Sequence, residues 1–363
     1  MKEILIKIFP GIILSVFIAF IGIIFSSYLG IGILNFDKSP ISPIMVAIVL
    51  GLVISNIFNI SEKFKKGINF SISNILKFGI VCLGIRLGFS DIINLGLVAL
   101  PIILICITAA LMTVRFLKKR IKVSDRMSIL IAVGTSVCGS SAIVATAPSI
   151  NASKEEVTYA IANITLFGIL AMFFYPFIAY YIFNGDEYLA GLFIGTSIHE
   201  TAQVAGAALI YSDQYNALKT IDVATVSKLA RNTFMLLIIP LMAFIYHKNS
   251  KDIQEIKDFS ILKLFPIFIL GFIIMGIFRT IGDITLESSG YSYGFLPSHI
   301  WVLIINNLKH IAEISLTIAM ASLGLSTNLR SLSTLGVKPF YIGFAAAISV
   351  GVVSLISIKL IIV

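Results

Sequence analysis

The chain carries little charge for its length. Only 12% of its 363 residues are Asp, Glu, Lys or Arg, compared with about 25% in soluble globular domains, and 58% are hydrophobic. Polar stretches long enough for a soluble domain are lacking, since the longest are 247–260 and 283–298, and both have the charge and Gly/Ser content of loops. With a mean hydropathy of +1.01, these absences exclude a soluble fold.

Motifs for covalent or cofactor chemistry are also lacking. The sequence has no nucleophile–base–orienter set, P-loop or dinucleotide fingerprint. Its three cysteines lie inside apolar runs without CxxC or zinc spacing, so we predict no disulfide framework. Cys82 and Cys106 are interpreted as small buried hydrophobes, whereas Cys138 lies in a polar interruption. We therefore expect neither an enzyme nor a cofactor or metal site.

What the chain does have is a series of apolar runs of about 20–30 residues, each long enough to cross a hydrocarbon core of about 30 Å. We predict an all-α polytopic membrane protein of about eleven transmembrane helices, two of them interrupted, forming one transporter domain over 1–363 with approximate halves 1–183 and 184–363. The predicted spans are 10–34, 41–58, 71–89, 92–117, 127–149, 156–183, 188–211, 222–246, 261–282, 304–325 and 335–362. The first is too long for a signal-peptide core and lacks a small-residue cleavage site, so we expect it to be retained.

The basic residues gather in alternate loops, although the net charge of +9 could suggest a nucleic-acid partner. The clusters are Lys63, Lys65 and Lys66; Lys118, Lys119, Arg120, Lys122 and Arg126; and Lys248, Lys251, Lys257 and Lys263. This is the positive-inside pattern. It predicts a membrane protein with a cytoplasmic N-terminus, an external C-terminus and external loops at 35–40, 150–155, 212–221 and 283–298. The basic surplus then faces anionic lipid headgroups and no nucleic acid.

Two sets of segments resemble each other. Leu87-Gly-Phe-Ser90 and Leu323-Gly-Leu-Ser326 each end a predicted span and precede a span with an early proline, Pro101 or Pro339. Their opposite directions suit an inverted-topology repeat, with chance similarity as the alternative. Spans 127–149 and 188–211 are also alike but would run in the same direction. Either they converged on a similar helix break or one is a re-entrant hairpin, and the sequence leaves this open.

The first polar interruption lies in span 127–149. Its small and polar residues are Gly134, Thr135, Ser136, Cys138, Gly139, Ser140 and Ser141. Glycine costs about 1 kcal/mol in a helix relative to alanine, and hydroxyl groups can bond freed backbone groups. A helix that restarts after Gly139 would direct its first N–H groups at the break, where an anion can bind. We predict a substrate-binding segment here, with close helix packing as the alternative.

The second interruption, in span 188–211, brings ionisable groups into an apolar run. On a helix, His199 and Gln203 would share one face, as would Thr196 and Glu200. A charge at the centre of a membrane helix costs about 2.5–3.5 kcal/mol and normally faces a cavity or a partner. We predict that His199 and Glu200 couple transport to protons, with a structural polar network as the alternative. Adjacent residues without a second His do not suit a metal.

Span 222–246 adds cations. Lys228, Arg231 and Asn232 share one helical face, where the cations could bind an anion or neutralise Glu200. The alternative is that they reach toward the outer surface. Four further polar residues in spans form a second rank of candidates: Arg86, Asn163, Thr165 and Glu313.

At these residues the chain resembles the YeiH-type family of bacterial inner-membrane proteins, which are described as sulfate exporters. The similar segments, in family order, are Ser136-Val-Cys-Gly-Ser-Ser-Ala142, Ala147-Pro-Ser-Ile150, Thr165-Leu-Phe-Gly168, Tyr175-Pro176, Ile198-His-Glu-Thr-Ala-Gln-Val204 and Lys228-Leu-Ala-Arg231. They cover roughly the central third of the chain. The resemblance implies a polytopic permease, distantly similar to ten-helix inverted-repeat transporters with crossed broken helices.

Our leading hypothesis is a secondary transporter of a small anion, such as sulfate or a related sulfur oxyanion. Substrate would bind at 134–141, Lys228 and Arg231 would balance its charge, and a proton or Na⁺ would drive the movement. The rival hypotheses are a cation/proton antiporter that uses Glu200, and a membrane protein that transports nothing. The expected partners are the anion, the coupling ion and the bilayer, and a homodimer is left open.

Overall fold

The computed structural model describes residues 2–28, 32, 42–58, 60–249, 264–327 and 336–363. These residues are almost entirely helical, and contacts divide the chain into two compact units. Unit 1 comprises 1–97, 209–222 and 267–326, and unit 2 comprises 98–208, 223–266 and 327–363. Each unit takes segments from both predicted halves, and the single-domain organisation stays a prediction.

Unit 1 is built mainly from helices. Its elements are α1 (Lys2–Ser27), α2 (Pro43–Ile57), α3 (Glu62–Phe70), a π-helical segment (Ser71–Ile75), α4 (Leu76–Leu83), a 3₁₀ turn (Gly84–Arg86), the start of α5 (Phe89–Ile121), the end of α10 (Thr201–Tyr215), the start of α11 (Lys219–Thr233), α13 (Phe268–Ser289), β1 (Tyr291–Ser292), β2 (Leu296–Pro297) and α14 (Ser298–Ser326). Helices α2 and α14 approach so closely that a Cβ on Gly51 would lie 2.5 Å from the Ala321 carbonyl oxygen. Small residues permit such contacts between membrane helices.

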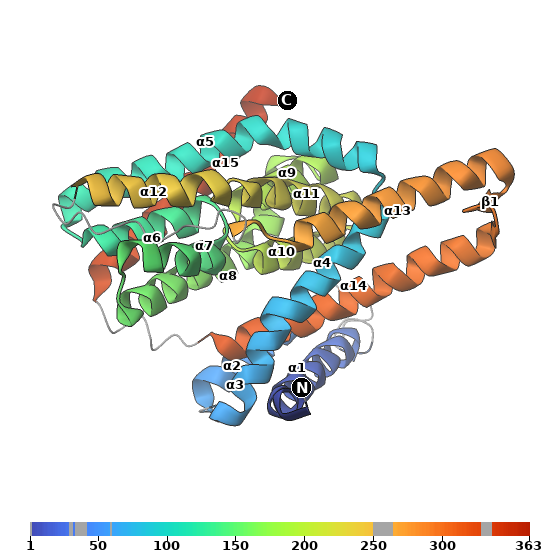
Figure 1. Ribbon diagram of the computed structural model, residues 1–363, viewed down its shortest axis with the longest axis horizontal. Helices are drawn as coiled ribbons and strands as arrows, with labels where there is room; N and C mark the ends of the chain where they lie inside the picture. The colour runs from blue at the N-terminus through green and yellow to red at the C-terminus, as the bar shows by residue number, and fades with distance from the viewer. Residues whose placement is uncertain (1, 29–31, 33–41, 59, 250–263, 328–335) are drawn as a thin grey trace. The chain divides into compact units, whose positions relative to one another are not determined.

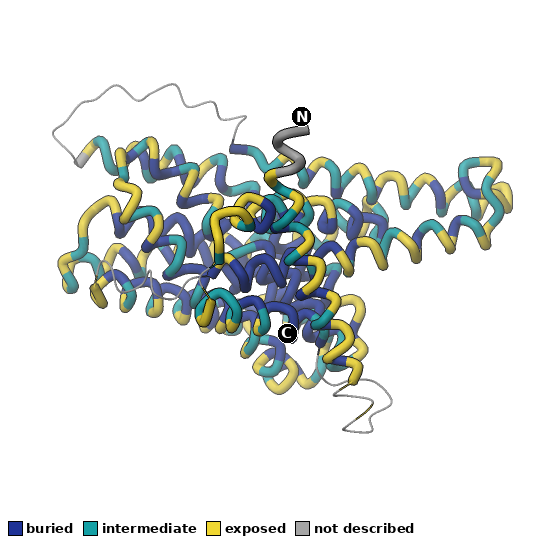
Figure 2. The backbone as a smooth tube through the Cα atoms, turned by 90° about the horizontal axis from the view of Figure 1, so that it is seen from below, coloured by how far each residue is buried: buried dark blue, intermediate teal, exposed yellow. Residues whose placement is uncertain are grey.

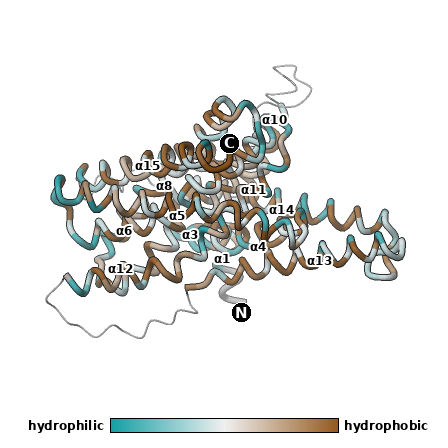
Figure 3. Tube along the Cα trace, turned by 90° about the horizontal axis from the view of Figure 1, so that it is seen from above, coloured by the Kyte–Doolittle hydropathy of each residue, from teal (hydrophilic) through white to brown (hydrophobic). Residues whose placement is uncertain are grey.

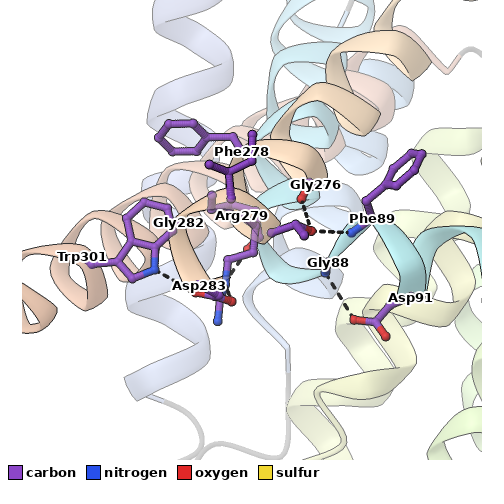
Figure 4. A network of polar contacts seen from close by, with 12 residues as sticks. Gly88, Phe89, Asp91, Gly276, Phe278, Arg279, Gly282, Asp283 and Trp301 are labelled. Atoms are coloured by element: carbon purple, nitrogen blue, oxygen red, sulfur yellow. Dashed lines mark hydrogen bonds and ion pairs between the residues drawn. The ribbon is translucent and has the colours of Figure 1, made fainter. Parts of the chain in front are cut away.

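A polar network in unit 1 ties α13 to α14 and to the start of α5 (Figure 4). Asp283 accepts hydrogen bonds from Arg279 on its own helix and from Trp301 Nε1 on α14, the latter at 2.8 Å. Thr280 Oγ1 accepts from the Phe89 amide at 2.8 Å. Trp301 itself is 1% exposed, so the network anchors a large buried ring by its one polar atom.

Unit 2 contains the candidate site. Its elements are the rest of α5, α6 (Asp125–Ser136), α7 (Gly139–Thr146), a 3₁₀ turn (Ala147–Ile150), α8 (Lys154–Ile182), α9 (Glu187–Ser197), the first part of α10 (Thr201–Tyr215), most of α11 (Lys219–Thr233), α12 (Met235–Asn249) and α15 (Val337–Ile361). Figure 1 shows α6, α7 and α12 toward one end of this unit and α9 and α11 toward the other.

Helices α6 and α7 form a re-entrant hairpin. At its start, Arg126 Nε donates to Tyr246 Oη on α12 at 3.0 Å. At its end, the Ser149 carbonyl lies 2.8 Å from His247 Nε2 on the same helix. The chain therefore leaves at the end where it entered. α6 has 12 residues and rises about 18 Å, about half of what a bilayer crossing requires.

Helices α9 and α10 form a second hairpin that enters from the opposite end of unit 2. α8 begins beside the first hairpin, where Ser124 Oγ donates to Glu156 at 3.0 Å. It then rises about 43 Å over its 29 residues before α9 starts. α10 returns to the start of α11, and the 30-residue span Lys219–Lys248 leads back to the base of the first hairpin. Both interruptions are thus re-entrant hairpins.

The structure confirms the all-α polytopic class. Within the described residues, eight helices are long and apolar enough to cross a membrane, and Pro43–Ile57 is a shorter apolar helix. The predicted spans 127–149 and 188–211 were wrong as single crossings, because each turns back at its interruption. The similarity between these two segments no longer conflicts with an inverted-topology repeat, since the two hairpins enter unit 2 from opposite ends. The repeat of Leu87–Ser90 and Leu323–Ser326 stays a prediction.

The long helices expose apolar faces, as a protein in lipid requires. On α5, for example, Met112 is 59% exposed and Phe116 57%. Figure 2 shows exposed and buried residues alternating along the helices, and Figure 3 shows many hydrophobic residues along α12 and α13. Apolar patches of this extent are not left to water in soluble proteins.

Candidate functional site

The tip of the first hairpin lies between Ser136 and Gly139. Val137 and Cys138 leave the helical region, and Gly139 has φ +49°. That left-handed conformation costs a residue with a side chain about 1–2 kcal/mol. A Cβ on Gly139 would also lie 3.2 Å from Cβ of Glu200. Glycine is therefore required here both for the reversal and for contact with the other tip.

The second tip repeats the first in detail. α9 ends with Gly195-Thr-Ser197 as α6 ends with Gly134-Thr-Ser136. In both, the threonine hydroxyl donates to the carbonyl four residues earlier, at 2.8 Å for Thr135 and 2.7 Å for Thr196. Ile198 then takes an extended conformation before α10 begins at Thr201. The carbonyl groups that end α6 and α9 are thereby freed from helical bonding.

Two buried cations from α11 bind these freed carbonyls. Lys228 Nζ donates to Val137 and Ile198 at 2.9 Å each, and to His199. Lys228 is 0% exposed, and all three of its donors are thus used. A cation is stabilised at a helix C-terminus by the negative end of the helix dipole. Lys228 therefore holds the two tips together through the C-terminal ends of both half-helices.

Arg231 performs the same task one turn further on. It is 0% exposed, and its guanidinium donates to four carbonyl oxygens, two from each hairpin. These bonds go to Ser136 at 2.9 Å, Thr196 at 2.7 Å, Ile198 at 3.3 Å, and Thr135. The planar fork of arginine suits several acceptors held in fixed positions. Arg231 thus bonds matching threonine carbonyls, those of Thr135 and Thr196, in the two hairpins.

The acidic residue lies on the other side of the tips. Glu200 Oε1 accepts a hydrogen bond from Ser140 Oγ, at the N-terminus of α7. Next to it, Thr201 Oγ1 lies 3.4 Å from Cys138 Sγ and accepts from Asn232 Nδ2 at 3.0 Å. The N-terminal ends of α7 and α10, with their positive dipole ends, therefore also meet at the tips.

Gln203 connects the second hairpin to α8. Its Nε2 donates to the Thr165 carbonyl at 3.0 Å, and a Cβ on Gly168 would lie 1.8 Å from its Oε1. Gly168 therefore makes the space for this side chain. Asn163 is not part of the arrangement, because its amide donates to the Pro339 carbonyl on α15 at 3.1 Å.

In the part of the chain that the structure describes, several buried polar atoms at the tips have no hydrogen-bond partner, and three of them are carbonyl or carboxylate oxygens, which accept. Among the residues that the structure describes, His199 Nδ1, Glu200 Oε2, Gln203 Oε1 and Asn232 Oδ1 have no hydrogen-bond partner. The His199 ring is 2% exposed and is hydrogen-bonded to the Thr135 backbone. The side-chain nitrogens of Lys228, Arg231 and Gln203 are bonded within the protein, whereas these atoms and the Ser227 hydroxyl on α11 have no partner in the ranges described.

The structure thus gathers most of the predicted site residues at one place. The hydroxyls of Thr135 and Ser136 donate to carbonyls of their own helix, and it is their carbonyl oxygens that face Arg231. Ser141 is exposed, and Ser140 and Glu200 are partly exposed, so the tips are open on the side of the α7 N-terminus. Thr201 and Gly168 were missed as individual residues, although both lie within segments that carried the family resemblance.

The second-rank candidates Arg86 and Glu313 lie in unit 1. Arg86 Nε donates to Asp222 at 2.5 Å, with both side chains largely buried. Glu313 lies 3.8 Å from His310 on the same helix, α14. Within the described ranges, no cluster of three or more His, Cys, Asp or Glu side chains could hold a metal ion.

Membrane-crossing helices and two opposed re-entrant hairpins define the chain as a multi-pass helical membrane protein. The sequence profile of the family described as conserved hypothetical protein 698 matches residues 10–343. The UPF0324 membrane protein FN0533 of Fusobacterium nucleatum is 35% identical over 313 residues, covering 85% of this chain and 88% of the relative. SAG1125 of Streptococcus agalactiae, a UPF0324 membrane protein too, is 33% identical over 95% of both chains. The chain belongs to the UPF0324 membrane protein family, which confirms the expected relationship. No solved structure matches the chain.

Proposed function

We propose that the protein is a secondary transporter that moves a small anion across the cytoplasmic membrane. The observation that carries this proposal is the charge at the hairpin tips, where two fully buried cations, Lys228 and Arg231, accompany one carboxylate, Glu200. Buried charges in a membrane protein are costly and mark ion pathways. A net positive buried cluster is stabilised by an anion nearby.

The anion would be bound by backbone rather than by the cations directly. Lys228 and most of the Arg231 donors are occupied by carbonyl groups, so their charge acts on the site through space. Direct donors are the first N–H groups of α7 and α10 and the exposed Ser141 hydroxyl. An oxyanion such as sulfate offers the acceptors that such a set of donors requires, and sulfate is the first substrate to test.

Sulfate flux tests the proposal. Purified protein in liposomes is expected to move labelled sulfate, and Ser141→Glu is expected to reduce this flux by about tenfold or more, because a carboxylate at the α7 N-terminus repels the anion. Ser288→Glu, at an exposed position on α13, adds the same charge elsewhere and should leave the flux unchanged. Proton flux that depends on an external cation, without movement of sulfate or another anion, would instead make the protein a cation/proton antiporter.

The hairpins also change the expected membrane topology. With α2 counted as a crossing, nine crossings keep the N-terminus inside and the C-terminus outside, and the three basic clusters remain cytoplasmic. The segment 150–155, predicted outside, returns to the cytoplasmic side, because it lies at the same end of unit 2 as Ser124 and His247. The connection 183–186 moves to the outside.

Cysteine labelling distinguishes the two topologies. Lys154→Cys should react with a membrane-impermeant maleimide from the same side as Lys119→Cys, and Asn184→Cys from the opposite side. All three positions are exposed, and the native cysteines are buried, so the background should be low. Eleven single crossings would place residues 154 and 119 on opposite sides, which would contradict the hairpins.

A further inference from the structure

We infer that the hairpin tips also bind a small cation, a proton or Na⁺, at Glu200 Oε2, and that this cation accompanies the anion. The inference rests on the proposed anion transport and names its coupling partner. It comes from the kind of polar atoms that are left without partners, namely acceptors.

The side-chain nitrogen donors of Lys228, Arg231 and Gln203 at the tips are paired. Lys228 donates three bonds and Arg231 four, all to backbone carbonyls. Gln203 Nε2 donates to the Thr165 carbonyl, which fixes the orientation of that amide because its nitrogen must face the carbonyl oxygen. Its Oε1 is therefore an acceptor. A ligand that completes these bonds must bring a proton or a positive charge.

Among the unpartnered acceptors, Glu200 Oε2 has the greatest need of a ligand, because it belongs to a carboxylate. Its Oε1 has a donor in Ser140, whereas its Oε2 is buried with no partner in the described part of the chain. A buried charge is normally paired or neutralised. Protonation neutralises it, and Na⁺ does the same with carboxylate and amide oxygens as ligands. Glu200 is also partly exposed beside Ser140, which gives the cation access.

The charge balance connects the cation to the anion. Two cations and one carboxylate give the tips a net charge of +1. A divalent oxyanion bound there leaves one negative charge uncompensated in a buried place, and one cation at Glu200 removes it. The other titratable groups that face these residues are His199 beside Glu200, Cys138 in the opposite tip and Cys106 on α5. The arrangement therefore favours one cation for each divalent anion.

Binding measurements without any anion test the site. Purified protein is titrated with ²²Na⁺ in a buffer whose other cation is N-methylglucamine, and infrared difference spectra between low and high pH record the C=O stretch of a protonated carboxyl. Glu200→Gln should weaken Na⁺ binding by about tenfold or more, or remove the carboxyl band. Glu313→Gln, a half-buried carboxylate on α14 in unit 1, should leave that result unchanged.

The outcomes distinguish Na⁺ from a proton, and they test the cation site separately from anion transport. Na⁺ binding lost in Glu200→Gln identifies Na⁺, and a carboxyl band lost in that variant identifies the proton. If neither signal depends on Glu200, the cation site is overturned, whereas sulfate flux can still stand. An intact cation site without sulfate flux overturns the anion instead. If Glu200→Gln does not fold, Ser140→Ala serves, since removing the donor to Oε1 should shift the carboxyl band or the Na⁺ affinity.

Discussion

Arg231→Met is expected to lower the free energy of unfolding by about 3 kcal/mol or more, because a buried polar group left without its partner costs about 1–3 kcal/mol. Four backbone oxygens, from Thr135, Ser136, Thr196 and Ile198, would lose a charged donor at once. Lys228 cannot replace it, because its three donors are already bonded. The two half-helix ends would then lose one of the two side chains that join them. Thermal unfolding of the purified protein in detergent measures the change, and sulfate flux should be lost with it.

Two controls show whether the effect comes from the geometry of the guanidinium. Arg231→Lys keeps the charge but not the planar fork, so its stability should fall between those of Arg231→Met and the wild type. Arg126→Ala removes an exposed arginine whose bond goes to Tyr246 Oη, and its stability should change by about 0.5 kcal/mol or less. If Arg231→Met unfolds at the wild-type temperature, the tips are not held by this residue.

The sequence predicted the position of Arg231 but not its partners. Helical spacing put Lys228, Arg231 and Asn232 on one face, and the cost of burying charge in lipid indicated a function. Their partners are backbone carbonyls, which every residue has, so no side-chain pattern could reveal them. These carbonyls come within reach only because two helices end at the same place in the folded protein.

The interruptions were predictable and the reversals were not. Gly134-Thr-Ser and Gly195-Thr-Ser were recognised as breaks, and Gly139 as the point where a helix restarts. A segment such as 127–149 is equally long whether it crosses the bilayer or enters and returns. The folded chain shows that it returns, because its first and last residues both contact neighbouring residues of α12, Tyr246 and His247. The basic loops could not expose the error, because two re-entrant hairpins leave the positive-inside pattern intact.

The cluster of unpartnered acceptors also lay beyond the sequence. His199, Glu200 and Gln203 were predicted site residues by type and location, but the sequence does not tell which of their atoms are already bonded. The structure supplies this for Gln203, whose amide nitrogen is taken by Thr165, and for Glu200, whose Oε1 is taken by Ser140. Only the folded chain therefore shows which polar atoms of these side chains are left to bind a ligand.

Gly139→Ala is expected to reduce sulfate flux by about tenfold or more, with a loss of stability of about 1–2 kcal/mol from the left-handed backbone. The new methyl group would lie 3.2 Å from Glu200 Cβ and 3.5 Å from its Cα and Cγ, so Glu200 must move by a few tenths of an ångström. Such a shift changes the position of the carboxylate relative to Ser140. Flux and thermal unfolding are measured on the same preparation.

Gly290→Ala separates the backbone effect from the contact with Glu200. Gly290 ends α13 with φ +76°, and a Cβ there would meet no atom within 4 Å. The two variants should therefore lose similar stability, because both force alanine into the left-handed region, and only Gly139→Ala should lose transport. Equal flux in the two variants would mean that the contact between the hairpin tips does not matter for transport. A loss of flux confined to Gly139→Ala would mean that transport depends on how closely the tip of the first hairpin approaches Glu200.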